Sequence, residues 1–262
     1  MQNLRTYGKA PYTVAVIHGG PGAPGQMAPV ARELSGNWGV LEPLQTAASF
    51  EGQVQELKTV LENHADIPVT LIGFSWGAWL SYILAAGYPE LVKKLILIGS
   101  GSFEEKYADK INDIRFSRLC EDERKEAYSL INIFTDPSEV DKNTAFARLG
   151  KLFTKADACN PVTLETEEID VQYNIFQSVW SEAAELRRRG TLLKLGKQIQ
   201  CPVVAVHGDY DAHLPEGVQK CLSNILEDFK FILLKNCGHM PWIETAAKDE
   251  FYKILKEESG KV

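Results

Sequence analysis

Short apolar runs alternate with amphipathic stretches through the first hundred residues. The runs are rich in β-branched and aliphatic side chains and lie at residues 13–17, 38–41, 69–73 and 95–99. Between the second and third runs, apolar residues recur at helical spacing from Phe50 to Leu61 behind Ser49, a favourable N-cap, and predict a helix over residues 50–63. Apolar runs without polar alternation are typical of strands that are covered on both faces. The pattern therefore predicts an α/β fold, with helices on both faces of a mostly parallel sheet.

A long segment interrupts this alternation. From about residue 103 to residue 190, apolar residues keep helical spacing and no strand candidate recurs. An all-helical insertion at this place is best interpreted as a lid over the carboxyl ends of the strands, where open α/β sheets bind ligands. We therefore predict a core of residues 1–102 and 191–262, and a helical cap of residues 103–190.

The alternation of strands and helices resumes after the insertion. Apolar runs at residues 202–208 and 229–234 predict two more strands, and a helix is expected between them at about residues 216–226. A final helix is expected from about Thr245 to Lys256. These runs bring the number of predicted buried strands to six.

Composition and charge fit one sizeable core. The chain has 262 residues, of which 45% are hydrophobic, and this favours a single domain or a core with an inserted lid over two independent domains. The formal net charge of −7 argues against non-specific binding to nucleic acid or to an anionic membrane, because both would repel the protein. The one basic cluster, Arg187-Arg188-Arg189, directly precedes Gly190 and is interpreted as the C-terminal end of a helix.

The cysteines and the N-terminal residues bear on the compartment. Five cysteines are odd in number, widely spaced and without a C-x-x-C pair, so neither a disulfide framework nor a zinc site is predicted. The first eight residues lack the apolar stretch of a signal peptide, and no apolar run approaches the roughly 20 residues that a membrane-spanning helix needs. We expect a cytoplasmic protein.

The segment with the clearest chemical implication is a serine between two apolar runs. Gly73-Phe74-Ser75-Trp76-Gly77 fits the pattern G-x-S-x-G, in which a strand must reverse into a helix within one or two residues. A side chain at position 73 or 77 would collide with neighbouring backbone, and Ser75 is expected in a strained conformation with an exposed hydroxyl. The helix that begins under Ser75 would stabilise an anion formed there.

An acid and a histidine also follow predicted strand ends. Asp211 lies just past the strand at 202–208, and His239 lies in the loop after the last strand. A serine hydroxyl is a poor nucleophile at neutral pH, so it needs a base that titrates near pH 7 and a carboxylate that holds the imidazole in the useful tautomer. We therefore predict Ser75 as the nucleophile, His239 as the base and Asp211 as the group that orients His239.

The other histidines near strand ends have competing interpretations. His213 is a rival base, and it is disfavoured because it lies two residues from Asp211, too close in sequence for an easy side-chain relay. His18 and His207 precede glycines and are expected to position loops by hydrogen bonding. The histidines form no i,i+4 or H-x-H pair, so no metal site is predicted, and the proposed chemistry needs no cofactor.

Along nearly its whole length, the chain resembles the α/β-hydrolase superfamily. Two segments together resemble its prolyl iminopeptidase branch, namely His18-Gly19-Gly20-Pro21-Gly22 and Ser75-Trp76-Gly77. Two others are similar to the acid and histidine segments of the wider superfamily, namely Gly208-Asp209-Tyr210-Asp211 with Pro215, and Gly238-His239. The order serine, acid, histidine is also that of α/β-hydrolases.

The resemblance assigns further roles. It implies that Asp211 is the acid, which leaves Asp209 as a turn residue, and that the oxyanion hole uses the N–H groups of Gly20 and Trp76. One segment departs from the iminopeptidases: residues 41–46 stand where those enzymes have an aspartate, arginine and glycine motif. This loop lies beside the expected pocket, so carboxylesterase and aminopeptidase specificity both stay open.

These inferences predict a serine hydrolase for a small ester, amide or short peptide. Phe103, Trp180 and Trp242 are candidate pocket walls. From a different class, the alternative is a non-catalytic ligand-binding or receptor module that keeps the pocket and uses the lid as a switch. The complete set of serine, acid and histidine favours the enzyme.

Acidic residues in the lid offer a hypothesis about the substrate. Glu165, Glu167 and Glu168 lie at or near the start of a predicted helix, where acids are favourable without any ligand. In the sharper alternative, one of them pairs with a substrate ammonium group, as lid glutamates do in the iminopeptidases that this chain resembles. A buried carboxylate of this kind would discriminate against substrates that lack the amine.

Overall fold

The structure is a computed structural model that describes residues 3–136, 141–162 and 170–260. In these ranges one sheet has the strand order β1-β3-β2-β4-β5-β6-β7, and all neighbouring strands are parallel except β1 and β3. Its strands are β1 (Leu4–Tyr7), β2 (Tyr12–Ile17), β3 (Gly39–Pro43), β4 (Val69–Phe74), β5 (Val92–Ile98), β6 (Val203–Gly208) and β7 (Phe229–Leu234). The six predicted strands and the mostly parallel sheet are confirmed. The antiparallel strand β1 was not predicted, because only one of its four residues is buried and no pattern marks it.

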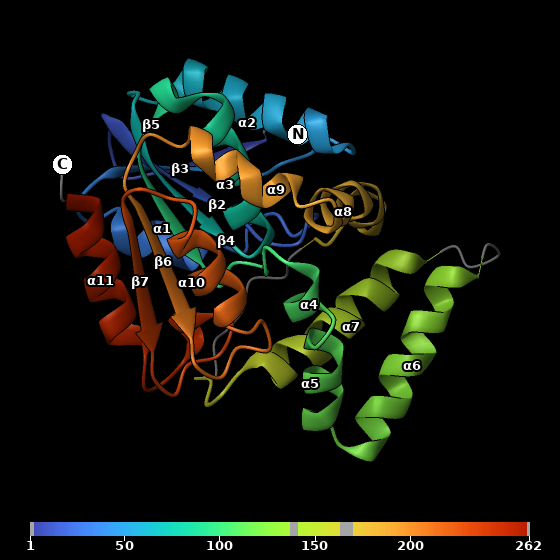
Figure 1. Ribbon diagram of the computed structural model, residues 1–262. Coiled ribbons are helices and arrows are strands. Elements are labelled where there is room, and N and C mark those ends of the chain that lie inside the picture. Colours follow the sequence, from blue (N-terminus) through green and yellow to red (C-terminus); the bar gives the residue numbers. More distant parts are fainter. Residues whose placement is uncertain (1–2, 137–140, 163–169, 261–262) are drawn as a thin grey trace.

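Helices cover both faces of the sheet, as predicted (Figure 1). One face packs against α1 (Ala28–Leu34) and α11 (Lys248–Gly260). The other face packs against α2 (Phe50–His64), α3 (Trp76–Gly87), α9 (Thr191–Lys194) and α10 (Glu216–Ser223). Three short 3-10 helices, η1 (Pro89–Leu91), η2 (Leu195–Gln198) and η3 (Pro241–Ile243), complete these connections.

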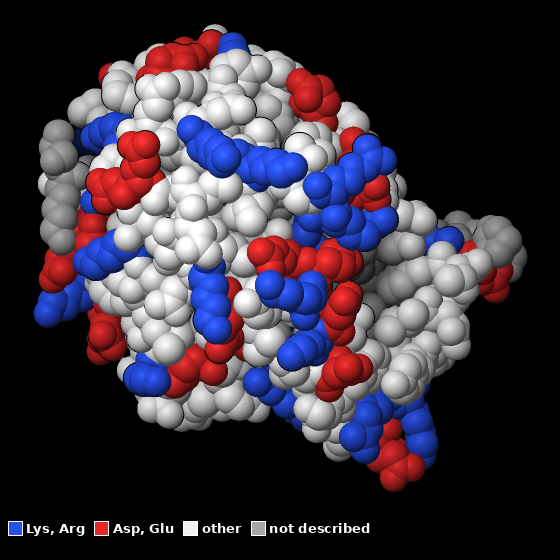
Figure 2. Space-filling view, in the orientation of Figure 1, with Lys and Arg blue, Asp and Glu red and all other residues white. Residues whose placement is uncertain are grey.

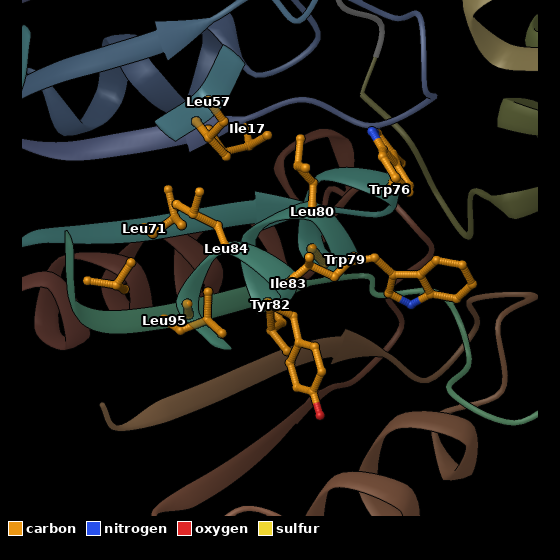
Figure 3. Packing of buried hydrophobic residues seen from close by; sticks show 14 of the residues in the cluster. Ile17, Leu57, Leu71, Trp76, Trp79, Leu80, Tyr82, Ile83, Leu84 and Leu95 are labelled. Atoms are coloured by element: carbon orange, nitrogen blue, oxygen red, sulfur yellow. The ribbon is translucent and has the colours of Figure 1, made fainter. Parts of the chain in front are cut away.

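Helix α3 is the buried centre of the second face. All but the last of its twelve residues are buried. Figure 3 shows its side chains packed among Ile17, Leu71 and Leu95 of the sheet and Leu57 of α2. Because the helix is held by apolar contacts on every side, the residue at its N-terminal end has a fixed position.

Two helix boundaries illustrate what local sequence specifies. Ser49 caps α2, with its hydroxyl oxygen accepting a hydrogen bond from the Gly52 N–H at 3.1 Å, as its N-cap prediction implied. The predicted start of α11 was wrong by three residues, and the helix continues to Gly260. Thr245 donates its N–H to Asn160 O at 3.0 Å, so a contact with a distant segment delays the helix.

The segment between β5 and β6 is helical where the structure describes it. Before α9 and η2, its helices are α4 (Glu105–Ala108), α5 (Ile111–Arg118), α6 (Glu121–Thr135), α7 (Lys142–Asp157) and α8 (Tyr173–Arg188). In Figure 1, α5, α6 and α7 project from the sheet, and they share a small apolar cluster of their own. Helix α8 instead joins the main cluster through Ile175, Val179 and Ala183.

The surface charges are mixed (Figure 2), and the cysteines are unpaired, as the absence of a predicted disulfide framework implied. Lys and Arg are interspersed with Asp and Glu over the face shown in Figure 2. All five cysteines are free thiols. Among the described residues, the helices are all too short or too polar to span a bilayer.

Candidate active site

Ser75 lies at the bend between β4 and α3. Its φ of 52° and ψ of −113° place a non-glycine residue in a strained region of backbone space. A Cβ atom on Gly73 would lie 2.2 Å from the Gly77 carbonyl oxygen, and one on Gly77 would lie 2.3 Å from that of Ile17. The predicted collision of any side chain at these two positions is therefore confirmed, as is the strain at Ser75.

The two predicted oxyanion donors belong to α3 and to the glycine-rich loop that contacts it. Trp76 is the first residue of α3, so its N–H has no acceptor within the helix. Gly20, with φ of 106°, lies in the glycine-rich loop after β2. This loop touches the bend, because a Cβ on Gly77 would lie 2.5 Å from the His18 carbonyl oxygen.

Asp211 and His239 are hydrogen-bonded to each other. The Nδ1 atom of His239 lies 2.7 Å from Oδ2 of Asp211, which is 3% exposed. Two different connections bring them together, since Asp211 follows β6 and His239 follows β7, and these strands are parallel neighbours. The pairing requires a proton on Nδ1, which leaves Nε2 as the acceptor for a second partner.

The loop of His239 is fixed by contacts that the sequence did not indicate. The His239 N–H donates to Asp157 O at 3.0 Å. Glu244, which is fully buried, accepts from the N–H groups of Gly238 at 2.9 Å, Cys159 at 2.8 Å and Asn160 at 2.8 Å. The end of α7 and the histidine loop are thus held together by one carboxylate.

The Ser75 bend and His239 both flank the carboxyl end of β5. The Ser75 N–H donates to Ile98 O at 2.9 Å, and the His239 ring lies 4.8 Å from the ring of Phe74. Among the described residues, no hydrogen bond joins the Ser75 hydroxyl to His239. Catalytic hydrogen bonds are often long without substrate and tighten when it binds.

His213 also binds Asp211, which contradicts the reason for setting it aside. Its Nδ1 atom lies 2.8 Å from Oδ1 of Asp211, and its backbone N–H donates to the same oxygen at 2.9 Å. A side chain two residues away therefore does reach the carboxylate, because the chain turns between them. The His213 ring also stacks on the His239 ring, with centroids 4.4 Å apart.

The carboxylate of Asp211 is ionised in this setting. Burial alone would raise its pKa, but the neighbouring His239 and His213, through charge and hydrogen bonds, hold the pKa of Asp211 well below its usual value. The third nearby ring belongs to His207, whose Nε2 lies 2.6 Å from the His213 carbonyl oxygen. The expectation that His207 positions a loop by hydrogen bonding is thereby confirmed.

Asp209 lies outside this cluster. Its Oδ1 accepts from the Cys237 N–H at 3.3 Å, and its Oδ2 lies 3.6 Å from Lys235 Nζ. It is a solvent-exposed residue that ties the end of β6 to the end of β7. This is the role expected of a turn residue.

The same cluster contains the donor atoms of a conceivable metal site. Ligand atoms of Asp211, His213 and His239 lie within 4.8 Å of one another. Each of the three residues, however, already hydrogen-bonds within the cluster. We therefore assign these atoms to hydrogen bonding, and the expectation of a metal-free site stays a prediction.

The predicted pocket walls lie at different depths. Trp180 of α8 stacks on Trp79, with ring centroids 5.4 Å apart. Phe103 is fully buried, with its ring centroid 4.9 Å from that of Tyr82, and Trp242 is buried against Phe74. The acids Glu165, Glu167 and Glu168 lie outside the described residues.

Burial of histidines makes the stability of the protein sensitive to acid. Burial lowers the pKa of His18 and of His213 to about 4, against about 6.5 in an unfolded chain. The unfolded state therefore binds more protons between these values, so stability is full above pH 6.5 and falls as the pH approaches 4. We expect a loss of about 3 kcal/mol for each histidine, measured by urea unfolding at pH 7.5 and pH 4.5.

A matched variant checks this assignment. His18→Asn removes one titrating ring, so its free energy of unfolding should fall less between the two pH values than that of the wild type. His64→Asn, at the exposed end of α2, should keep the wild-type dependence. Equal stability of the wild type at pH 7.5 and pH 4.5 would contradict the prediction.

Comparison with known proteins finds one family model and several hydrolases that are similar to this chain. A family model described as alpha/beta hydrolase fold matches residues 43–246. The chain is similar to a proline iminopeptidase of Lactobacillus acidophilus, with 25% identity over 267 residues that cover 93% of this chain and 88% of the relative. It is also similar to a pimeloyl-[acyl-carrier protein] methyl ester esterase of Neisseria meningitidis serogroup A, with 22% identity over 205 residues, 75% of this chain and 61% of the relative.

A solved structure shows the same fold. The crystal structure of a proline iminopeptidase of Mycobacterium smegmatis matches with a TM-score of 0.61 and 16% identity. The match covers 97% of this chain and 92% of that chain. At this identity the likeness concerns the fold alone.

Proposed function

The chain belongs to the α/β-hydrolase fold family, and on this premise we propose that it is a serine hydrolase that works through an acyl-enzyme. The observation that carries the proposal is the 2.7 Å hydrogen bond between buried Asp211 and His239, next to the strained bend that presents Ser75. A nucleophile, a base and a group that orients the base are the three parts that such chemistry needs.

In the first half of the proposed reaction, the Ser75 Oγ attacks the substrate carbonyl carbon and His239 Nε2 takes the hydroxyl proton. Asp211 stabilises the imidazolium that forms, because its ionised carboxylate accepts a hydrogen bond from the Nδ1–H group and stays unprotonated. The N–H groups of Gly20 and Trp76 donate to the oxyanion, and the N-terminus of α3 adds its positive dipole. The leaving group departs with the proton from His239.

In the second half, water replaces the leaving group. His239 removes a proton from a water molecule, which attacks the acyl carbon, and the proton passes to Ser75 as the acid product leaves. No step requires a cofactor. The cycle consumes one ester or amide and one water molecule, and it returns Ser75 and His239 to their starting protonation states.

We place residues 103–190 over this site as a cap. Gln172, just before α8, donates its N–H to Gly22 O at 2.9 Å, so this end of α8 contacts the glycine-rich loop. Phe176 and Trp180 of α8 follow with ring centroids 6.2 Å apart, and Trp180 stacks on Trp79 of α3. An aromatic wall this close to the Ser75 bend suits an apolar acyl group.

A fluorophosphonate probe and a substrate panel test the proposal. We expect the probe to label the wild-type protein at Ser75, identified by peptide mass, and the protein to hydrolyse short-chain p-nitrophenyl esters. Labelling requires an activated serine, which a ligand-binding module does not need. A folded protein that is neither labelled nor active would support the binding module instead.

Aminoacyl anilides in the same panel separate the two specificities. If a lid acid binds a substrate ammonium group, Glu165→Gln, Glu167→Gln or Glu168→Gln should raise KM for the anilides and spare simple esters. Glu51→Gln, at an exposed position of α2, provides the matched control. A wild type that cleaves short acyl esters well and gains nothing from a free α-amine is a carboxylesterase.

A further inference from the structure

His213 has contacts that a three-residue mechanism does not require. We propose that it is a positioning residue of the hydrolase: it locks the Asp211 carboxylate, and through it the His239 ring, in the orientation that proton transfer needs. The inference rests on the proposed function, and it adds a fourth side chain to the reaction's supporting structure. His213 itself is buried, with 7% of its surface exposed.

The two oxygens of Asp211 are divided between two histidines. Oδ1 accepts from the backbone N–H of His213 at 2.9 Å and from its Nδ1 at 2.8 Å, whereas Oδ2 lies 2.7 Å from His239 Nδ1. A carboxylate held by one partner can rotate about its Cβ–Cγ bond. Here rotation would break two hydrogen bonds at Oδ1, so Oδ2 stays directed at His239.

The stacked rings add a second restraint. The His213 and His239 centroids are 4.4 Å apart with 21° between the ring planes, and the Phe74 ring lies 4.8 Å from His239. Close packing on the ring limits its rotation about χ2 while leaving its edge free to exchange protons. Rotation of the His239 ring would move Nε2 away from Ser75.

His213 can do this because it stays neutral. Burial lowers its pKa to about 4, against the opposing charge of Asp211, and the charges of His239 and Arg115 lower it further. A neutral ring donates one Nδ1 proton to Asp211 and does not repel the imidazolium that forms on His239 during the reaction. His207 holds the His213 backbone through its Nε2, 2.6 Å from the carbonyl oxygen.

Two substitutions separate the hydrogen bond from the ring. His213→Asn places a side-chain N–H near the position of Nδ1, whereas His213→Phe keeps an aromatic ring and removes the donor. We expect His213→Phe to lower kcat about 10- to 100-fold with KM unchanged, and His213→Asn to recover most of kcat. His213→Gln, whose amide corresponds to Nε2, should resemble His213→Phe and replaces it if that variant does not fold. His64→Asn is the control and should match the wild type.

A second measurement needs no catalytic turnover, so it tests the role of His213 independently of the proposed function. In a Ser75→Ala background, the Nδ1 proton of His239 bonded to Asp211 should give a slowly exchanging downfield proton NMR resonance. We expect it to persist in His213→Asn and to broaden or vanish in His213→Phe, because a mobile carboxylate no longer protects it.

The outcomes are distinguishable. If the folded His213→Phe or His213→Gln protein keeps both kcat and the resonance, or changes only its melting temperature, the inference is overturned. If the wild type shows no probe labelling and no turnover, the proposed function fails. The resonance then decides alone whether His213 orders the Asp211–His239 pair.

Discussion

Replacement of Ser75 by alanine should abolish turnover and leave the fold intact. The substitution removes the one oxygen that the proposed mechanism uses as nucleophile, and loss of such a nucleophile costs about 10⁶-fold in kcat by the precedent of serine proteases. Ser75 is a partly exposed residue, and its hydrogen bond to β5 uses the backbone N–H. Alanine has the same backbone requirements as serine there, so the free energy of unfolding should change little.

Ser81 offers a matched control. It lies on the same helix α3, is fully buried, and its hydroxyl has no partner among the described residues. Ser81→Ala should therefore keep the wild-type kcat, whereas Ser75→Ala should show only background hydrolysis and no probe labelling. Both proteins should give wild-type circular dichroism. A folded Ser75→Ala protein with undiminished activity would remove the mechanism altogether.

Much of the fold was predictable because strong apolar patterns specify it locally. The six predicted strands are buried runs without polar alternation, and the sheet that joins them follows from their separation by helices. Strand β1 carried no such signal, since three of its four residues are exposed or partly exposed and it lies at the edge of the sheet, paired with β3. The start of α11 depends on a contact with Asn160, which lies 85 residues away from Thr245.

The candidate site residues at the strand ends could be predicted from the sequence only in part. Gly73 is explained by crowding within the bend itself, against Gly77, whereas Gly77 is crowded by the carbonyl oxygens of Ile17 and His18; the G-x-S-x-G spacing marks both positions. The Asp211–His239 pair could be proposed because parallel neighbouring strands bring their carboxyl ends together. The role of Glu244 had no signal, because its three donors come from two loops that only the folded chain assembles.

His213 shows where sequence spacing misleads. Two residues of separation disfavour a side-chain contact in regular structure. In a helix i and i+2 do not face each other, and in a strand they share a face but lie about 7 Å apart. The segment after β6 is neither, and its turn directs both the backbone N–H and the ring of His213 to the same carboxylate oxygen. Short polar side chains such as aspartate favour turns of this kind by bonding to backbone two residues on.

Asp211→Asn should lower kcat by about 10⁴-fold, and the arrangement of donors around Asp211 explains why. Both donors of His213 point at Oδ1, so the amide oxygen of an asparagine would take that place and its NH2 group would face His239. The NH2 group donates, which forces Nδ1 of His239 to accept and moves the ring proton to Nε2. His239 would then hold the tautomer that cannot take the proton of Ser75.

Asp209→Asn is the matched comparison. This acid is near Asp211 in sequence, but among the described residues its carboxylate contacts the Cys237 N–H and Lys235 at the end of β7. The substitution should cost little in kcat, since an asparagine can accept the same hydrogen bond. Steady-state kinetics of both purified variants on one p-nitrophenyl ester, with thermal unfolding as the check on folding, measures the ranking. The reverse ranking would assign the acid to Asp209, and equal small losses would show that His239 needs no carboxylate.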